Sequence, residues 1–140
     1  MNGKRFFGVL LLVASAIAQQ QPTVSLVALV SHPERYDRKE IVVSGFLYLQ
    51  RERNALYISK ADFQHAQFKN SVYLLMTNDV FERAYPFNGC YVVVKGVFDA
   101  KHTGHMGDFS AELNVSRVTG VWDSTVPDAA KDPADPVACK

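Results

Sequence analysis

Five short runs of residues alternate between apolar and polar positions, and they constrain the fold more than any other feature of the chain. The runs cover residues 40–50, 55–59, 71–76, 90–98 and 109–121. In the last run the odd-numbered positions from 109 to 115 are apolar and the even-numbered positions from 110 to 116 are polar. A period of two is the pattern of a β-strand with one buried face. The sequence therefore predicts five strands.

The first of these runs carries a glycine at its centre. Gly45 lies on the same face as Ile41, Val43, Leu47 and Leu49, while the opposite face is mixed. A glycine inside a strand predicts a bulge or a sharp bend. A strand that is apolar on one side and mixed on the other fits a curved sheet or a barrel.

Helical signals are short and lie between the strands. Residues 25–30 predict a helix that Ser25 caps and Pro33 ends. Residues 60–68 predict a short helix or an irregular link, and residues 78–83 predict one or two helical turns capped by Asn78 or Asp79. We therefore expect an all-β protein with small helices added. Its predicted architecture is a five-stranded OB-fold-like Greek-key barrel, with an N-terminal short helix and a helical link after strand three.

Residues 1–18 have the three-part layout of a secretory signal peptide. Lys4 and Arg5 form a positive start, residues 6–18 carry no charge, and Ala16-Ile17-Ala18 is a small-x-small cleavage pattern. The alternative is a membrane anchor, which needs about 20 apolar residues. We expect cleavage after Ala18, no membrane span in the remaining chain, and a periplasmic or secreted protein.

The rest of the chain divides into one domain and a tail. Residues 19–122 contain all five runs and predict the OB-fold-like domain, whereas residues 123–140 are rich in Pro, Ala and Asp and predict a flexible tail. Without Lys4 and Arg5, thirteen basic residues stand against fourteen acidic ones, a formal charge of −1. Because nucleic-acid affinity depends on phosphate neutralisation, this balance makes nucleic acid a poor candidate as a partner.

The run that leads into the first strand resembles a group of exported bacterial proteins with an OB-fold of the tRNA-anti-like type. The similar runs are residues 25–26, 33–37 and 43–46, followed by 94–99, 104–107 and 109–110. In that group a short helix leads into a strand of the type PExYxxKxVxVxGF. The likeness covers roughly residues 24–119 and implies a fold more than a function. Arg38 is a departure, because such proteins often have glycine there, and it puts the local turn in doubt.

OB-folds usually bind ligands across strands two and three, between two flanking loops. The residues that fall on this surface are Arg51, Arg53, Tyr57, Tyr73, His102 and His105. Tyrosines could stack on a base or a sugar, and arginines could hold an anionic group. The alternative is that Tyr57 and Tyr73 are half-buried strand aromatics and that Arg51 and Arg53 are solvated charges.

Two further features concern metals and cysteines. His102 and His105, with Asp99 and Asp108, are weak candidates for a zinc or copper site, although Gly104 and Gly107 more simply mark a tight hairpin. We expect no metal and no cofactor. Cys90 and Cys139 could form a disulfide in an oxidising compartment, or Cys90 could be a buried free thiol.

The sequence contains no nucleophile elbow, HExxH motif or phosphate-binding glycine loop, so we expect no enzyme activity. The leading hypothesis is an exported binding or accessory module of the bacterial cell envelope. Its ligand would be a small polar molecule, a glycan fragment or an envelope protein, and we expect a monomer. Two alternatives remain: a metal-handling periplasmic protein that uses the loop of His102 and His105, and a protein that binds single-stranded nucleic acid.

Overall fold

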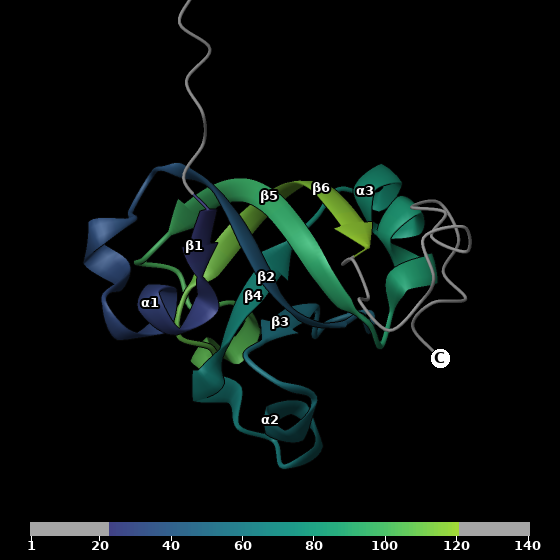
Figure 1. Ribbon diagram of the computed structural model, residues 1–140, viewed down its shortest axis with the longest axis horizontal. Coiled ribbons are helices and arrows are strands. Elements are labelled where there is room, and N and C mark those ends of the chain that lie inside the picture. Colours follow the sequence, from purple (N-terminus) through teal and green to yellow (C-terminus); the bar gives the residue numbers. More distant parts are fainter. Residues whose placement is uncertain (1–22, 121–140) are drawn as a thin grey trace, which may run out of the picture.

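The fold is a closed barrel, described by a computed structural model over residues 23–120 (Figure 1). Its five strands are β2 (Glu40–Tyr48), β3 (Ala55–Tyr57), β4 (Ser71–Leu75), β5 (Tyr91–Asp99) and β6 (Glu112–Gly120). They are hydrogen-bonded in the order β2-β3-β4-β6-β5, and β5 returns to pair with β2. The β4–β6 pair is parallel and the other pairs of the barrel are antiparallel. The predicted OB-fold-like barrel is confirmed.

The inner face of the barrel is the face that the alternating pattern predicts. Ile41, Val43 and Leu47 of β2 are completely buried, and so are Leu56 of β3 and Leu74 of β4. Together with Val92, Val94, Phe98 and Leu113 from β5 and β6 they belong to one core, which we call the inner core. Burying side chains of this size contributes about 1.5–3 kcal/mol each, so the alternation alone accounts for much of the closure.

Two short helices lie at opposite ends of the barrel (Figure 1). In α1 (Leu26–Ser31), Leu26 and Leu29 are buried, and the Ser25 hydroxyl accepts from the Ala28 N–H at 3.1 Å, which confirms the predicted cap. The cap of α3 (Asn78–Ala84) was predicted one or two positions too late. Thr77 has the extended backbone of a cap, and its Oγ1 accepts from the Val80 N–H at 3.4 Å.

Of the two alternatives predicted at Gly45, a bulge or a sharp bend, the bulge is not found there. Gly45 pairs regularly with Val92, and the register shift lies instead at Lys95 and Gly96, opposite β6. A side chain at position 45 would begin 2.7 Å from Cγ of Leu56. The glycine is therefore required by the close approach of β3, and not by an irregular ladder.

Some elements differ from their predicted bounds. A short strand, β1 (Thr23–Ser25), pairs parallel with β2 and had no signal in the alternating pattern. The last strand begins at Glu112, and the residues before it already lie beside β4, where the Ser110 N–H donates to the Ser71 carbonyl and the Tyr73 N–H donates to the Ala111 carbonyl. The link between β3 and β4 contains α2 (Lys60–Gln64) and a 3₁₀ helix, Phe68–Asn70.

Arg38 has a backbone φ of +60°, a left-handed conformation that favours glycine. This is the position where the resembling proteins often carry glycine. Its N–H donates to the Phe98 carbonyl at 2.8 Å, so the turn is kept despite the arginine.

The predicted signal peptide at residues 1–18 and the predicted tail at 123–140 lie outside the described residues. Within residues 23–120, no helix combines the length and the apolar character needed to span a membrane.

Candidate functional site

The outer face of β3 and β4 is the usual ligand surface of this fold, and here aromatic side chains fill it. It lies between the loop of residues 49–54, which joins β2 to β3, and the loop of residues 100–111, which joins β5 to β6. We call these rings the outer aromatic cluster; its members are Phe46, Tyr48, Tyr57, Phe63, Phe68, Tyr73 and Phe109. The cluster is separate from the inner core and lies on the other side of the sheet.

The segment of residues 60–70 covers one half of this face. Phe63 of α2 places its ring centroid 4.2 Å from that of Tyr48, 5.7 Å from Phe46 and 5.6 Å from Tyr57. In Figure 1, α2 lies outside the barrel, below β3 in this view. The ring of Phe63, from the link between β3 and β4, thus packs over the aromatic rings of the strands.

The loop of residues 100–111 covers the other half. The Phe109 ring lies 5.5 Å from the Tyr73 ring and 6.0 Å from the Phe68 ring. Gly104 lies directly on Tyr73, since a Cβ at this glycine would be 2.5 Å from Cγ of the tyrosine. Gly104 also has a φ of +69°, so both its backbone and its lack of a side chain are needed here.

The segment of residues 60–70 and the loop of residues 100–111 limit the exposure of the two predicted tyrosines, Tyr57 and Tyr73. Tyr57 is 2% exposed, and burial raises the pKa of its hydroxyl, partly offset by the nearby charge of Arg53. Tyr73 is half-buried, and burial raises its pKa, with additional contributions from Glu112 and Glu52. The alternative of buried strand aromatics describes both positions in this conformation. Their role as ligand-contacting residues stays a prediction.

Arg53 is the predicted arginine that makes a specific contact. Its guanidinium lies 5.4 Å from the centroid of the Phe68 ring, within the range of a cation–π interaction. We call this pair the Arg53–Phe68 platform. Arg51 is exposed near it, on a surface hollow of about 350 Å³ lined by residues 50–53.

A second hollow is lined by Phe68 itself. It has a volume of about 380 Å³ and is lined by residues 66–69, Gly107 and Asp108. The Lys69 ammonium donates to the carbonyls of Gly107 at 3.3 Å and Phe109 at 3.2 Å, so it ties residues 60–70 to the loop of residues 100–111. Arg53 thus lines the first hollow and Phe68 the second, and each hollow carries at least one exposed cationic residue together with one acidic residue, Glu52 in the first and Asp108 in the second.

The histidine loop contains one ion pair. His102 Nδ1 lies 2.7 Å from Oδ2 of Asp99, and this hydrogen bond raises the pKa of His102 and lowers that of Asp99. His105 and Asp108 are not brought to this pair as a cluster. Among the residues described, no group of three or more His, Cys, Asp or Glu side chains could hold a metal ion. The loop thus carries one exposed pair of a histidine and a carboxylate.

Cys90 is 5% exposed and immediately precedes β5. Its predicted partner, Cys139, lies outside the described residues, so the disulfide stays a prediction.

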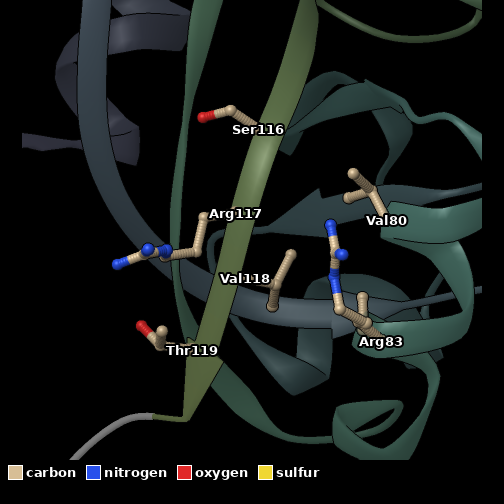
Figure 2. Close-up of a pocket in the computed structure, with 7 residues that line it drawn as sticks. Val80, Arg83, Ser116, Arg117, Val118 and Thr119 are labelled. Atoms are coloured by element: carbon tan, nitrogen blue, oxygen red, sulfur yellow. The ribbon is translucent and has the colours of Figure 1, made fainter.

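A third hollow, of about 480 Å³, lies between α3 and β6 (Figure 2). Arg83 and Arg117 both line it, yet Figure 2 shows that they point away from one another, to the two sides of β6. Arg83 is paired with Asp79 at 2.7 Å, and the Ser116 hydroxyl donates to the Lys95 carbonyl. These polar groups do not converge on one point, so the hollow lacks the features of a ligand site.

Sequence reasoning missed four residues of the site, namely Phe63, Phe68, Lys69 and Phe109. Residues 60–68 were interpreted as a link between strands, and Phe109 as an inward strand residue. A signal was available, because Phe63 and Phe68 are two large apolar residues in an otherwise mostly polar segment. Their contacts with the barrel depend on the path of the loop, which periodicity does not describe.

No family model and no curated protein match this sequence. Among solved structures, the chain is similar to a proposed aspartyl-tRNA synthetase from Leishmania major, with 15% identity and a TM-score of 0.47. It is also similar to the asparaginyl-tRNA synthetase from Pyrococcus horikoshii complexed with asparaginyl-adenylate, with 20% identity and a TM-score of 0.42. Each likeness covers 76% of this chain, but only 22% and 24% of the respective synthetase chains.

The expectation that nucleic acid is a poor candidate as a partner is not upheld, because the argument on which it was based does not apply to this surface. That expectation rested on the net charge of the whole chain. A net charge does not describe the local distribution, in which Arg51, Arg53 and Lys69 lie close to one platform.

Proposed function

We propose that the protein binds single-stranded nucleic acid without catalysing a reaction, and that the strand follows the Arg53–Phe68 platform and the two hollows beside it. The observation that carries the proposal is the Arg53 guanidinium 5.4 Å from the Phe68 ring, between two hollows and two loops. Proteins that bind single strands combine cationic grooves with aromatic rings on which bases stack.

The platform has the two chemical groups that a nucleotide requires. Phe68 is partly exposed and offers a ring, and a stacked base contributes about 1–3 kcal/mol. Arg53 and Arg51 are exposed guanidinium groups, which suit phosphate oxygens because they present a planar fork of donors. Lys69 adds a third cation at the far hollow while it holds two carbonyls. The bases of the bound nucleic acid would therefore stack on the platform, and its phosphates would contact the cationic side chains.

The small number of cations limits the expected strength of binding. Three cations near the platform would neutralise at most about three phosphates, which predicts a slope of log affinity against log salt of about −2. Binding should be weak at physiological salt and only moderately sensitive to it. A steep slope would indicate a different and more basic surface.

The test is fluorescence anisotropy with a labelled single strand of about eight nucleotides, as DNA and as RNA, at about 50 mM salt. Arg53→Ala and Phe68→Ala should each weaken binding about tenfold, as expected for the loss of one stacked base or one phosphate contact. Arg83→Ala is the matched control, because it removes an exposed arginine from α3, away from the platform. The proposal fails if the wild-type protein binds neither strand, or if Arg53→Ala behaves like Arg83→Ala.

A second candidate function is the exported binding module for a small polar molecule, a glycan fragment or an envelope protein. The observation that favours it is the pattern of residues 1–18, which has the layout of a signal peptide. Mass spectrometry of the full chain expressed in bacteria tests the export step, and a mature protein that begins at Gln19 is expected. An uncleaved chain would remove the basis of this candidate. A neutral ligand would also bind without the salt dependence of a nucleic acid.

A further inference from the structure

Phe63 sits in a cage of aromatic rings that belong to the barrel. Its ring is stacked on Tyr48, with centroids 4.2 Å apart and planes 31° apart, and meets Tyr57 edge-on at 5.6 Å and 67°. Phe46 closes a further side at 5.7 Å, and Tyr91 lies against Phe46 at 5.6 Å. Such distances are those of favourable aromatic pairs. The cage therefore accepts a flat ring and contacts both a face and an edge of it.

The residue that fills the cage comes from a segment with little support of its own. Helix α2 has five residues, none of which is fully buried, and helices this short are not stable alone. No residue of segment 60–70 contributes to the inner core. Apart from the rings, hydrogen bonds attach the segment to its neighbours: the Lys60 N–H donates to the Tyr91 hydroxyl at 3.1 Å, the Ile58 N–H donates to the Asn70 carbonyl at 3.0 Å, and the Lys69 ammonium donates to two carbonyls of the loop of residues 100–111. Within the segment, Asn70 Nδ2 donates to Asp62 at 2.7 Å and so joins α2 to residue 70. These bonds anchor the end of the segment that carries Phe68, whereas α2 with Phe63 could move aside without disturbing the inner core or the Arg53–Phe68 platform.

The rim of the cage carries polar groups that suit the edge of a base. The Tyr48 hydroxyl donates to Oε1 of Gln50 at 3.2 Å, and the Tyr91 hydroxyl accepts from Lys60. Burial raises the pKa of the Tyr57 hydroxyl, and the nearby charge of Arg53 offsets part of this rise. A ligand in the cage would therefore meet stacking surfaces, hydroxyl groups and a cation together.

We propose that the cage is a binding site for one nucleobase, and that Phe63 occupies it in the free protein. This inference rests on the proposed function, since it places one base of the bound strand in the cage next to the Arg53–Phe68 platform. The base exchanges with the Phe63 ring as α2 moves aside. Because of this self-occupancy, the apparent affinity equals the intrinsic affinity multiplied by the fraction of molecules in which the cage is open. Removal of the Phe63 ring should therefore tighten binding.

The test compares Phe63→Ala with the wild-type protein, using calorimetry with adenosine monophosphate and anisotropy with the labelled single strand. Phe63→Ala should bind adenosine monophosphate about tenfold more tightly, a factor within the range that one stacked base provides. Ribose phosphate, which lacks the base, should show no gain. Phe81→Ala is the matched control, because Phe81 is also a half-buried phenylalanine of a short helix, packed on Tyr85 at 5.7 Å.

A folded Phe63→Ala protein that binds adenosine monophosphate no better than the wild type would overturn the inference, as would an equal gain for Phe81→Ala. If Phe63→Ala does not fold, Asn70→Ala takes its place, because it removes the hydrogen bond to Asp62 and leaves every ring intact. We expect a gain of about threefold for that variant, in line with the loss of one hydrogen bond, and an absence of gain would equally overturn the inference.

The two proposals fail in different ways. If binding of the single-stranded nucleic acid depends on Arg53, but removal of Phe63 does not raise the affinity for adenosine monophosphate, the proposed function stands. The cage is then excluded as a nucleobase site. A gain for adenosine monophosphate in Phe63→Ala, without strand binding by any variant, would keep the cage and exclude the proposed function.

Discussion

The inner core and the outer aromatic cluster lie on opposite sides of the same strands, yet they are built differently. The inner core is mainly aliphatic, and its strand residues are nearly all completely buried. The outer cluster consists mainly of aromatic rings, several of them partly exposed, and Phe63, Phe68 and Phe109 come from connecting segments. The inner core closes the fold, whereas the outer cluster depends on segments that connect the strands. Stability and binding are therefore expected to respond to different substitutions.

The largest expected effect is in the inner core. Leu74→Ala should lower the free energy of unfolding by about 3 kcal/mol, because it leaves a cavity in a fully buried site. Leu75→Ala is the matched control, since the neighbouring side chain points outward and is 44% exposed. Urea denaturation followed by circular dichroism measures both values. Equal losses would show that the two faces of β4 do not differ as described.

The next effect is in the outer cluster. Gly104→Ala should destabilise the protein by about 2 kcal/mol, because the new methyl group would meet the Tyr73 ring and the backbone is left-handed. Gly89→Ala provides the comparison: it has a φ of +85° but nothing within 4 Å of the new atom, so only the backbone term applies. Thermal denaturation should place Gly89→Ala between Gly104→Ala and the wild type. The reverse order would contradict the packing of Gly104 on Tyr73.

A smaller effect concerns the segment that covers the cage. Hydrogen bonds from Asn70 and Ser59 lower the pKa of Asp62, so its ionised form is favoured by folding. The resulting stability is present above the unfolded pKa of about 3.9 and is lost as the pH falls through the lower folded value. Asp62→Asn should therefore lose up to about 1 kcal/mol at neutral pH and progressively less in acid. A difference that stays constant with pH would contradict this explanation.

The smallest effect is in the loop beside the platform. The hydrogen bond to Asp99 raises the pKa of His102 above its usual value of about 6.5. The stability that this pair provides is present below the unfolded pKa and is lost as the pH rises through the folded pKa. Nuclear magnetic resonance titration should show His102 losing its proton at a higher pH than it does in Asp99→Asn. Identical titration curves would exclude the pair in solution.

The inner core was predictable because its information is local. The faces of the first and third strands, the cap at Ser25 and the five-stranded barrel all follow from spacings within a few residues. Gly45 was recognised as a special position, but its reason was not, since the atoms that exclude a side chain there belong to β3. Only the folded chain supplies that neighbour.

The candidate site was predictable in part. Arg51 and Arg53 lie in the loop between β2 and β3, as predicted from the place of this loop in the fold, and their role in binding stays a prediction. Tyr57 and Tyr73 were placed on the right strands, but the residues that pack over them were not predicted. Those residues are Phe63 and Gly104, which reach the tyrosines through the paths of two long loops.

The sequence by itself determined that alternating strands close into a small barrel, because a period of two assigns each side chain to a face without knowledge of any distant residue. Only the tertiary structure decided that the outer face is filled by rings from the chain itself, and that Arg53 meets Phe68 there. The physical reason is that stacking requires two rings to meet at a defined distance and angle. That meeting depends on how loops fold over the barrel, and no local pattern records it.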